Sequence, residues 1–571
     1  MSTDVSAGRV ALTSFGPAAG TRAAPAPAPA ARNRRPAVEA PLLFLVSAAV
    51  RAPSFVRPFW SPDEGYLATE ATALRHGGRM YENVVDRKPP LVPWLYEACT
   101  ALAGRHALDL VRVLAVVALA VTAVFTARLA ARTLGEWAAL PAGVLTVAAS
   151  AALPAPDAMA ATFEIFMLPS TVAAMYYGLN RRYLVAGLAI AVAALTKQVG
   201  LAPLLPLAVR VLAGDRRGRE GAALAAGVTA PLVACALALG VRPFTFWVFL
   251  SSGSYASPPG AMAALDHAVA ASADLLTVFA PFAPFALPAA SAALRRRRGG
   301  GQPRTRKRHP GTGTPDAPRR RHSEAGTAGL WLLASAAGVT TGYHFYGHYF
   351  LQLVPAAALV AMHGVNAAFR DPGSPPRGTR HLVIRARRAR TAAAAAGCAL
   401  VIAAGWTGGA LAGAPPEMDK SLALAAAVDA HSGPRQSVFL WGMHPEVYRL
   451  ADRKAASRFL TAGLLTNFSG NGDPRRVGAT YAVPGAWRAF RHELATAPPS
   501  LVVDDSAGTP YPLAGYPVLR DVLARHYEVV ETVQGARIYR RTGSSRGWRR
   551  ASGSLPPPVS GQSRSEGSGG P

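Results

Sequence analysis

Long apolar runs dominate the sequence and restrict the chain to one broad class of protein. Two of them, 111–130 and 392–413, match the roughly 20 residues that a helix needs to cross the hydrocarbon core of a bilayer. Half of the 571 residues are hydrophobic and only 16% are charged. The sequence therefore predicts a polytopic α-helical membrane protein rather than a string of soluble domains.

Hydropathy predicts about eleven membrane spans, of which the pair 183–199 and 200–214 is interrupted by Pro203 and Pro206. The predicted spans are 38–57, 108–130, 136–153, 163–179, 183–199, 200–214, 221–241, 272–294, 325–342, 349–366 and 391–412.

Positive charge is concentrated in two connections between apolar runs. The stretch 295–321 holds eleven Lys and Arg residues against one acid, and 370–390 holds seven Arg residues. Such loops face the cytoplasm under the positive-inside rule, so their charge is explained by topology. The runs also lack the interleaved aromatic residues that binding of single-stranded nucleic acid would require, so nucleic-acid binding is not indicated. With the N-terminus inside, an odd span count places both 58–107 and the C-terminal region outside. We expect a multi-pass protein of the plasma (inner) membrane.

The chain divides into a membrane domain at 38–412 and a small extracytoplasmic α/β domain at 413–542, with tails of disordered composition at 1–37 (cytoplasmic) and 543–571. The membrane domain contains an outer loop, 58–107, and a basic cytoplasmic loop, 295–324. Within the α/β domain, strand and helix patterns alternate. Strands are predicted within 436–442, 500–505 and 527–541, and helices at 484–497 and 517–527.

The first outer loop is too long for a simple connection. Segments 64–78 and 88–102 favour short helices along the membrane surface. Asp63 and Glu64 follow Pro62 at the start of the first helix. They either cap free backbone N–H groups or supply a general base near the membrane surface.

Further polar residues are predicted at the same outer level. Lys88 is either a snorkelling residue or an anion ligand. Lys197 lies in an apolar span, where a buried charge normally has a partner. Asp157 lies in an outer turn and Glu164 begins the next span. The segment 342–355 places two His among several aromatic residues, a pattern also typical of an interfacial aromatic belt. Acid, Lys and His at one depth suit an anionic lipid headgroup and a hydroxyl or amine acceptor.

Taken together, four sequence motifs resemble those of the GT-C superfamily of membrane glycosyltransferases. The resemblance is to the group related to dolichyl-phosphate-mannose–protein mannosyltransferases and bacterial aminoarabinose transferases, and it covers most of 38–366. The motifs are "SPDEGYLATEA" with the later "RKPPLVPWLY", "PAPDAMAATFEIFMLP", "LTKQVG" and "YGHYFLQLVP".

The resemblance implies an enzyme that takes a sugar from a polyprenyl-phosphate donor on the outer face of the membrane. Asp63 matches the family's acidic residue in the first outer loop, which is the expected catalytic base, and Glu64 completes the acidic pair. The residues implied in binding the donor phosphate are Lys88, Lys197, His348 and Tyr349. Those implied more weakly in substrate binding are Arg87, Asp157 and Glu164.

Several other kinds of site are not indicated. The sequence has no phosphate-binding loop or nucleotide fingerprint, which argues against a nucleotide-sugar donor. No spacing requires a metal or another cofactor, and Cys99, Cys235 and Cys398 form no disulfide framework. The expected partners are membrane lipid, the lipid-linked sugar and an acceptor that is protein, lipid or polysaccharide. "NFS" at 467–469 matches an N-glycosylation acceptor by chance.

Two other functions compete with the transferase. A transporter or flippase of a lipid-linked sugar would also place charges near its spans, but it explains neither the structured outer loop nor its Asp-Glu pair, and no inverted hydropathy repeat is visible. An envelope scaffold would leave Lys197 without a purpose. In the outer domain, Trp441, His444 and Glu446 are candidates for acceptor binding, although packing and helix capping explain them better.

Overall fold

The computed structural model describes residues 36–252, 261–287, 316–369, 379–412, 416–470 and 472–543. The predicted disordered tails lie outside these residues except for 36–37 and 543. Of the predicted basic loop at 295–324, only 316–324 is described.

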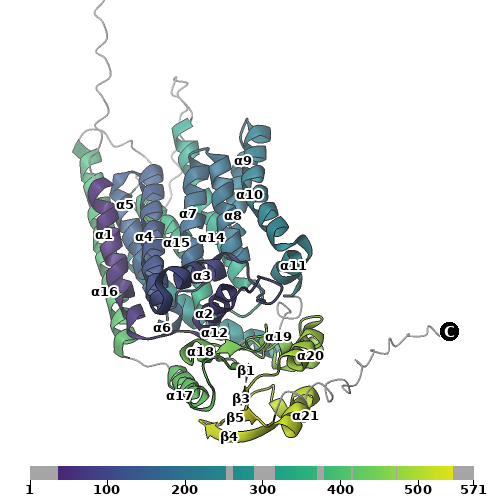
Figure 1. Ribbon diagram of the computed structural model, residues 1–571. Coiled ribbons are helices and arrows are strands. Elements are labelled where there is room, and N and C mark those ends of the chain that lie inside the picture. The colour runs from purple at the N-terminus through teal and green to yellow at the C-terminus, as the bar shows by residue number, and fades with distance from the viewer. Residues whose placement is uncertain are drawn as a thin grey trace, which may run out of the picture.

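A bundle of long helices forms one part of the molecule, and an α/β domain covers one end of it (Figure 1). The helices of the bundle are α1 (Pro36–Arg51), α4 (Ala107–Leu134), α5 (Ala139–Ala151), α7 (Phe163–Leu179), α8 (Tyr183–Thr196), α9 (Leu204–Leu212), α10 (Arg217–Leu239), α12 (Ala261–Phe279), α14 (Asp316–Thr340), α15 (Val354–Ala368) and α16 (Thr379–Ala412).

Small residues set the packing of the bundle. Helix α5 contacts α1, α4, α15 and α16, and all of its residues except Leu140 are buried. Most of these residues are Ala, Gly or Val. Without a hydrophobic driving force between helices in lipid, small side chains let the helix backbones approach closely and gain van der Waals contact. The abundance of Ala in the sequence therefore has a direct packing role.

Six helical segments of the described residues are long and apolar enough to cross a membrane, which supports the multi-pass fold. The count of eleven spans stays a prediction, because α5, α7, α8 and α9 are shorter than these six and α14 is not among them. The six segments are Glu39–Val56, Leu91–Leu134, Arg217–Leu239, Leu265–Leu287, Gly347–Ala368 and Val383–Ala412.

Three helices begin before the membrane spans predicted for them. Helix α16 begins at Thr379, so the Arg-rich stretch that was predicted to be part of a loop is helical from there. Arg, Leu and Ala are strong helix formers, and they extend the helix beyond its apolar part. Likewise α14 begins at Asp316, inside the predicted basic loop, and α12 begins at Ala261 rather than at 272.

Short helices gather at the end of the bundle that faces the α/β domain (Figure 1). Among them are α2 (Pro62–Arg75) and α3 (Leu91–Ala103), which confirm the two helices predicted in the first outer loop. Pro62 occupies the first turn of α2, where its missing N–H costs nothing. The others are α6 (Ala155–Met159), α11 (Val241–Thr245), the π-helix η5 (Phe246–Leu250) and the 3₁₀ helices η4 (Gln198–Leu201) and η7 (Gly347–Leu353).

The C-terminal domain contains a five-stranded mixed sheet with the order β2-β1-β3-β5-β4. Strand β1 is parallel to β2 and β3, whereas β5 is antiparallel to β3 and β4. The α/β prediction is confirmed, although β2, α17, α18 and α19 were not predicted. The elements are α17 (Pro416–His431), β1 (Ser437–Trp441), α18 (Glu446–Leu450), β2 (Lys454–Ala455), α19 (Gly463–Thr466), α20 (Ala486–Thr496), β3 (Leu501–Asp504), α21 (Pro517–His526), β4 (Tyr527–Val533) and β5 (Ala536–Arg541).

Short 3₁₀ segments complete the described chain. They are η1 (Ala52–Val56), η2 (Gly104–His106), η3 (Glu136–Ala138), η6 (Ala280–Phe282), η8 (Pro474–Arg476), η9 (Ala479–Tyr481) and η10 (Leu513–Gly515).

Candidate active site

The two acids at the start of α2 have different surroundings. Glu64 is buried, and its carboxylate accepts hydrogen bonds from the backbone N–H groups of Trp60 (2.7 Å) and Ala161 (2.8 Å). Asp63 keeps 39% of its side chain exposed. Glu64 therefore ties α2 to the 158–162 segment, while Asp63 remains open to a ligand.

The 158–162 segment is held by side chains of other elements. The Arg51 guanidinium donates to the carbonyls of Ala158 (2.8 Å) and Met159 (2.9 Å). The Tyr96 hydroxyl donates to the carbonyl of Ala161 (2.7 Å). Because these donors satisfy buried backbone carbonyls, they hold the segment in place between α2 and α7.

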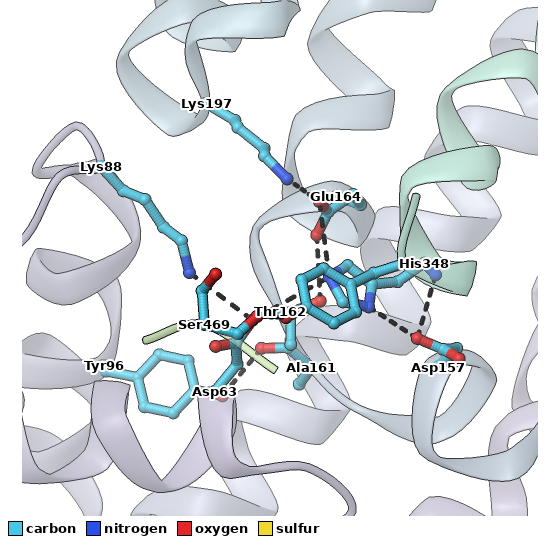
Figure 2. Close-up of polar contacts among 11 residues, drawn as sticks. Asp63, Lys88, Tyr96, Asp157, Ala161, Thr162, Glu164, Lys197, His348 and Ser469 are labelled. Carbon is cyan, nitrogen blue, oxygen red and sulfur yellow. Dashed lines mark hydrogen bonds and ion pairs between the residues drawn. The ribbon is translucent and has the colours of Figure 1, made fainter. Parts of the chain in front are cut away.

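Lys88 faces Asp63 from the loop before α3 (Figure 2). Its Nζ lies 3.5 Å from Asp63 Oδ2 and 4.4 Å from the centroid of the Phe163 ring. The Tyr81 hydroxyl donates to the Lys88 carbonyl at 3.0 Å, which fixes the backbone there. The ammonium group is thus held between a carboxylate and the face of an aromatic ring.

His348 approaches Asp63 from the opposite side, on η7. Asp157 Oδ1 lies 2.6 Å from His348 Nδ1 and also accepts the backbone N–H of His348 at 3.0 Å. A carboxylate only accepts hydrogen bonds, so Nδ1 carries the proton. The other nitrogen, Nε2, then lies 3.9 Å from Asp63 Oδ2 and 4.0 Å from Glu164 Oε1.

Lys197 and Glu164 form a buried ion pair beside His348. Lys197 has an extended backbone directly after α8, and its Nζ lies 3.7 Å from the centroid of the Tyr349 ring. Glu164 starts α7, where the helix dipole favours a negative charge, and it also accepts from the Thr162 hydroxyl at 3.2 Å. Each charge therefore has the partner that burial in a membrane domain requires.

The charges around Asp63 favour its ionised form. Burial of the carboxyl opposes ionisation, but the charges of Lys88, His348 and Lys197 outweigh it and hold the pKa of Asp63 below its usual value. Burial raises the pKa of Glu64 above its usual value, although nearby Arg112 and the backbone N–H bonds oppose that rise. Asp63 is thus ionised at neutral pH and partly exposed.

The structure brings most of the predicted site residues into one cluster, which we call the Asp63 cluster. Its members are Asp63, Lys88, Asp157, Glu164, Lys197, His348 and Tyr349. Figure 2 labels all of them except Tyr349. Of the remaining two, Glu64 bonds to backbone N–H groups. Arg87 donates from Nε to the Ser251 carbonyl at 3.2 Å, and its own carbonyl accepts from Gln198 at 2.8 Å.

Sequence reasoning missed three polar residues near the cluster. Tyr346 stacks on His348, with ring centroids 5.6 Å apart and planes 6° apart. Glu70 and Asp86 are buried acids, and burial together with the charge of Asp86 raises the pKa of Glu70 well above its usual value. Glu70 lies seven residues after Asp63, on the same face of α2, and that helical spacing was the available signal. No group of three metal-ligating side chains occurs among the described residues.

Comparison with known proteins agrees with the motif resemblance. Residues 87–247 match the family described as dolichyl-phosphate-mannose-protein mannosyltransferase. The match includes Lys88, Asp157, Glu164 and Lys197 but neither Asp63 nor the C-terminal domain. No curated protein matches the sequence.

Solved structures share the fold at low sequence identity. ArnT from Cupriavidus metallidurans bound to undecaprenyl phosphate is 13% identical with a TM-score of 0.54, covering 89% of this chain and 98% of that one. Its apo form is 14% identical with the same TM-score, covering 87% and 97%. An oligosaccharyltransferase from Archaeoglobus fulgidus is 12% identical over 88% and 73%, with a TM-score of 0.46 that is too low to define the fold. The chain therefore shares the fold of ArnT, and its residues 87–247 match the family described as dolichyl-phosphate-mannose-protein mannosyltransferase.

Proposed function

We propose that the protein is an inverting glycosyltransferase that moves a sugar from a polyprenyl-phosphate donor to an acceptor at the outer face of the membrane. The observation that carries the proposal is the Asp63 cluster. An ionised, partly exposed carboxylate faces two ammonium groups and an imidazole at the end of the bundle covered by the C-terminal domain. This arrangement suits a base beside a phosphate leaving group.

Asp63 acts as the general base. It takes the proton from the acceptor hydroxyl or amine as that group attacks the anomeric carbon. The bond from this carbon to the phosphate oxygen breaks on the opposite face, so the configuration inverts and polyprenyl phosphate leaves. A correctly placed base contributes roughly 10²–10⁴-fold to the rate.

Lys88, Lys197 and His348 stabilise the negative charge that develops on the leaving phosphate. Lys88 and Lys197 each pair with a carboxylate in the structure, so the positive charges are oriented before the donor arrives. Tyr349 lies against the Lys197 ammonium and limits where it can move. The ArnT structure with undecaprenyl phosphate supports a donor of this class.

The remaining predicted residues act by positioning. Asp157 holds His348 through the Nδ1 contact, and Glu164 holds Lys197. Glu64 fixes the start of α2 through two backbone N–H groups, so Asp63 keeps its place. Arg87 is anchored by Ser251 and directs the neighbouring Lys88 toward the site. None of these steps calls for a metal or another cofactor.

Donor turnover tests the function. The purified full chain in detergent is given a panel of polyprenyl-phosphate sugars with an envelope extract as acceptor, and released polyprenyl phosphate is measured. We expect release by wild type and by Glu82→Gln, an exposed acid of the same loop, but not by Asp63→Asn. The donor that reacts identifies the sugar. Donor binding without release by wild type would contradict the transferase and favour a transporter or flippase.

A further inference from the structure

The C-terminal domain contacts both segments that face each other across the Asp63 cluster. Asp63 lies on α2 and His348 lies on η7, with 3.9 Å between Asp63 Oδ2 and His348 Nε2. These segments are far apart in the sequence, so their separation depends on what holds each of them. The C-terminal domain contacts the segment on each side.

The first contact joins α2 to the start of α18. A Cβ atom built on Gly65 would lie 2.5 Å from Glu446 Cβ, so only glycine allows this approach. One turn later, the Thr69 hydroxyl donates to the Pro445 carbonyl at 3.1 Å. Gly65 is two residues after Asp63, so the contact fixes the turn of α2 that presents the carboxylate.

The second contact joins η7 to the loop after α19. The Tyr346 hydroxyl donates to the Ser469 carbonyl. Gly470 has φ +61, and a Cβ atom there would lie 2.9 Å from the Tyr346 hydroxyl oxygen. Because the Tyr346 ring stacks on His348, the contact reaches the imidazole directly. Figure 2 shows Ser469 among the residues of the site.

We propose that these two contacts form a clamp that sets the distance between Asp63 and His348, and that Tyr346, Ser469 and Gly470 are positioning residues for the transfer reaction. The clamp consists of the contacts of Gly65 with Glu446, Thr69 with Pro445, and Tyr346 with 469–470. The inference rests on the proposed function and extends it by assigning the C-terminal domain a direct part in site geometry. Neither the "NFS" motif nor the aromatic turn had this role in the sequence-based prediction.

The chemistry explains why a clamp matters. Reacting groups must be held within about 0.5 Å of their productive positions, and a misplacement of about 1 Å can cost on the order of 100-fold in rate. The Asp63–His348 pair has no direct hydrogen bond to keep it together at 3.9 Å. Lys88 and Lys197 are held by other contacts, so loosening the clamp affects Asp63 and His348 more than the two ammonium groups.

The central test compares two glycine substitutions in the full-length protein. Gly470→Ala places a methyl group against the Tyr346 hydroxyl. Gly485→Ala introduces similar backbone strain at φ +82, with no neighbouring atom within 4 Å, and serves as the matched control. We expect Gly470→Ala to lower kcat about tenfold while KM for the lipid donor changes less than twofold. Equal kcat in the two variants, or a fall in donor affinity instead of kcat, would overturn the clamp.

Removing the Tyr346 hydroxyl tests whether Gly470→Ala acts through that group. Tyr346→Phe keeps the stacked ring but removes the hydroxyl. The hydrogen bond to the Ser469 carbonyl is then lost, and so is the oxygen with which the methyl group of Gly470→Ala would clash. If the contact works as proposed, Gly470→Ala costs less kcat in the Tyr346→Phe background than in wild type. Additive losses would mean that Gly470 acts through something other than Tyr346.

Hydrogen exchange tests the clamp without any donor. Amides of 344–353 should exchange faster in Gly470→Ala than in wild type or Gly485→Ala, since the Ser469 contact no longer restrains η7. Unchanged exchange would refute the clamp, whatever the activity. Faster exchange in Gly470→Ala, when even the wild-type protein turns over no donor, would refute the proposed function and leave the clamp supported, so the two failures are distinguishable.

Discussion

Two parts of the molecule each combine a carboxylate, an ammonium group and an imidazole. The carboxylate is partly exposed in one part and buried in the other. In the membrane domain, Asp63 faces Lys88 at 3.5 Å and His348 at 3.9 Å. In the C-terminal domain, Asp505 contacts Lys420 and His444, each at 2.5 Å. We call the latter group the Asp505 trio.

The difference lies in exposure and in contact length. Asp505 keeps only 2% of its side chain exposed, and each of its carboxylate oxygens contacts one of the two cations. Asp63 keeps 39% exposed and its contacts are long. A carboxylate with both oxygens engaged stabilises structure, whereas one left partly open can accept a proton from a substrate. Geometry, and not residue type, therefore distinguishes the buried Asp505 from the role that we propose for Asp63.

The origin of the two groups differs as well. His444 follows β1 and Asp505 follows β3, and these parallel strands bring their carboxyl ends to the same edge of one sheet. Asp63, Lys88 and His348 come from separate segments of a membrane domain. One sheet suffices to bring His444 and Asp505 together, but the Asp63 cluster depends on how the helices pack.

The largest expected effect is a loss of activity when Asp63 is substituted, which we do not expect for Asp505. Asp63→Asn removes the proposed base, and we expect release of polyprenyl phosphate to fall about 10²–10⁴-fold. Its thermal unfolding should hardly change, because Asp63 is partly exposed and surface ion pairs add little stability. Turnover and thermal unfolding of the same preparation check both claims. Activity near wild type would remove Asp63 from the mechanism.

The next effect concerns Lys88. Lys88→Met keeps the side chain's length but removes its charge. We expect kcat to fall about 10²-fold, because a charge proposed to stabilise the leaving phosphate is lost. The pKa of Asp63 is held low mainly by Lys88 against the effect of burial, so its loss raises that pKa. The acidic limb of the pH–activity profile should therefore move to higher pH. Movement to lower pH would contradict the assigned contact.

The third prediction is the opposite of the first, because it expects a loss of stability with little loss of activity. Asp505→Asn weakens two buried contacts, and we expect the free energy of unfolding of the C-terminal domain to fall by about 1–3 kcal/mol. Activity measured well below the unfolding temperature should remain within about threefold of wild type, because the Asp505 trio is not part of the proposed reaction site. A large loss of activity in a folded variant would show that the Asp505 trio also acts on that site.

The sequence predicted both regions in part. Hydropathy and charge indicated the membrane domain, and alternating strand and helix patterns indicated the α/β domain. Helix ends were wrong where Arg-rich stretches continued a helix, since hydropathy detects the apolar part of a helix and not its ends. The two-residue strand β2 carries no periodic signal at all.

Motif resemblance predicted most residues of the Asp63 cluster, but not the contacts among them. The resemblance named seven residues that the structure brings together, yet nothing in their spacing showed that Asp157 holds His348 or that Glu164 holds Lys197. Such contacts depend on the packing of helices that are far apart in the sequence. Trp441, singled out in the outer domain, is completely buried and donates to the Tyr511 carbonyl, which confirms its interpretation as packing.

The smallest expected effect is the pH dependence of the Asp505 trio. Burial lowers the pKa of His444, but its hydrogen bond to Asp505 and the charges of Glu446 and Asp505 outweigh burial and the opposing charge of Lys420, so the pKa is raised. Folded His444 binds its proton more tightly than the unfolded chain does. Its stabilising contribution is therefore fully present below the unfolded value of about 6.5 and is lost as pH rises through the folded pKa.

Asp505 titrates in the opposite sense. Burial raises its pKa, but hydrogen bonds and charges from His444 and Lys420 hold it below the usual value, so its contribution is present above about pH 3.9 and is lost on further acidification. The difference in exchange protection of β1 and β3 between wild type and His444→Gln, compared at each pH, should be greatest between about pH 4 and 6.5. It should shrink at higher pH as His444 loses its charge. A difference that grows above that range would mean that neutral His444 is the stabilising form, and the contrast with the Asp63 cluster would then rest on exposure alone.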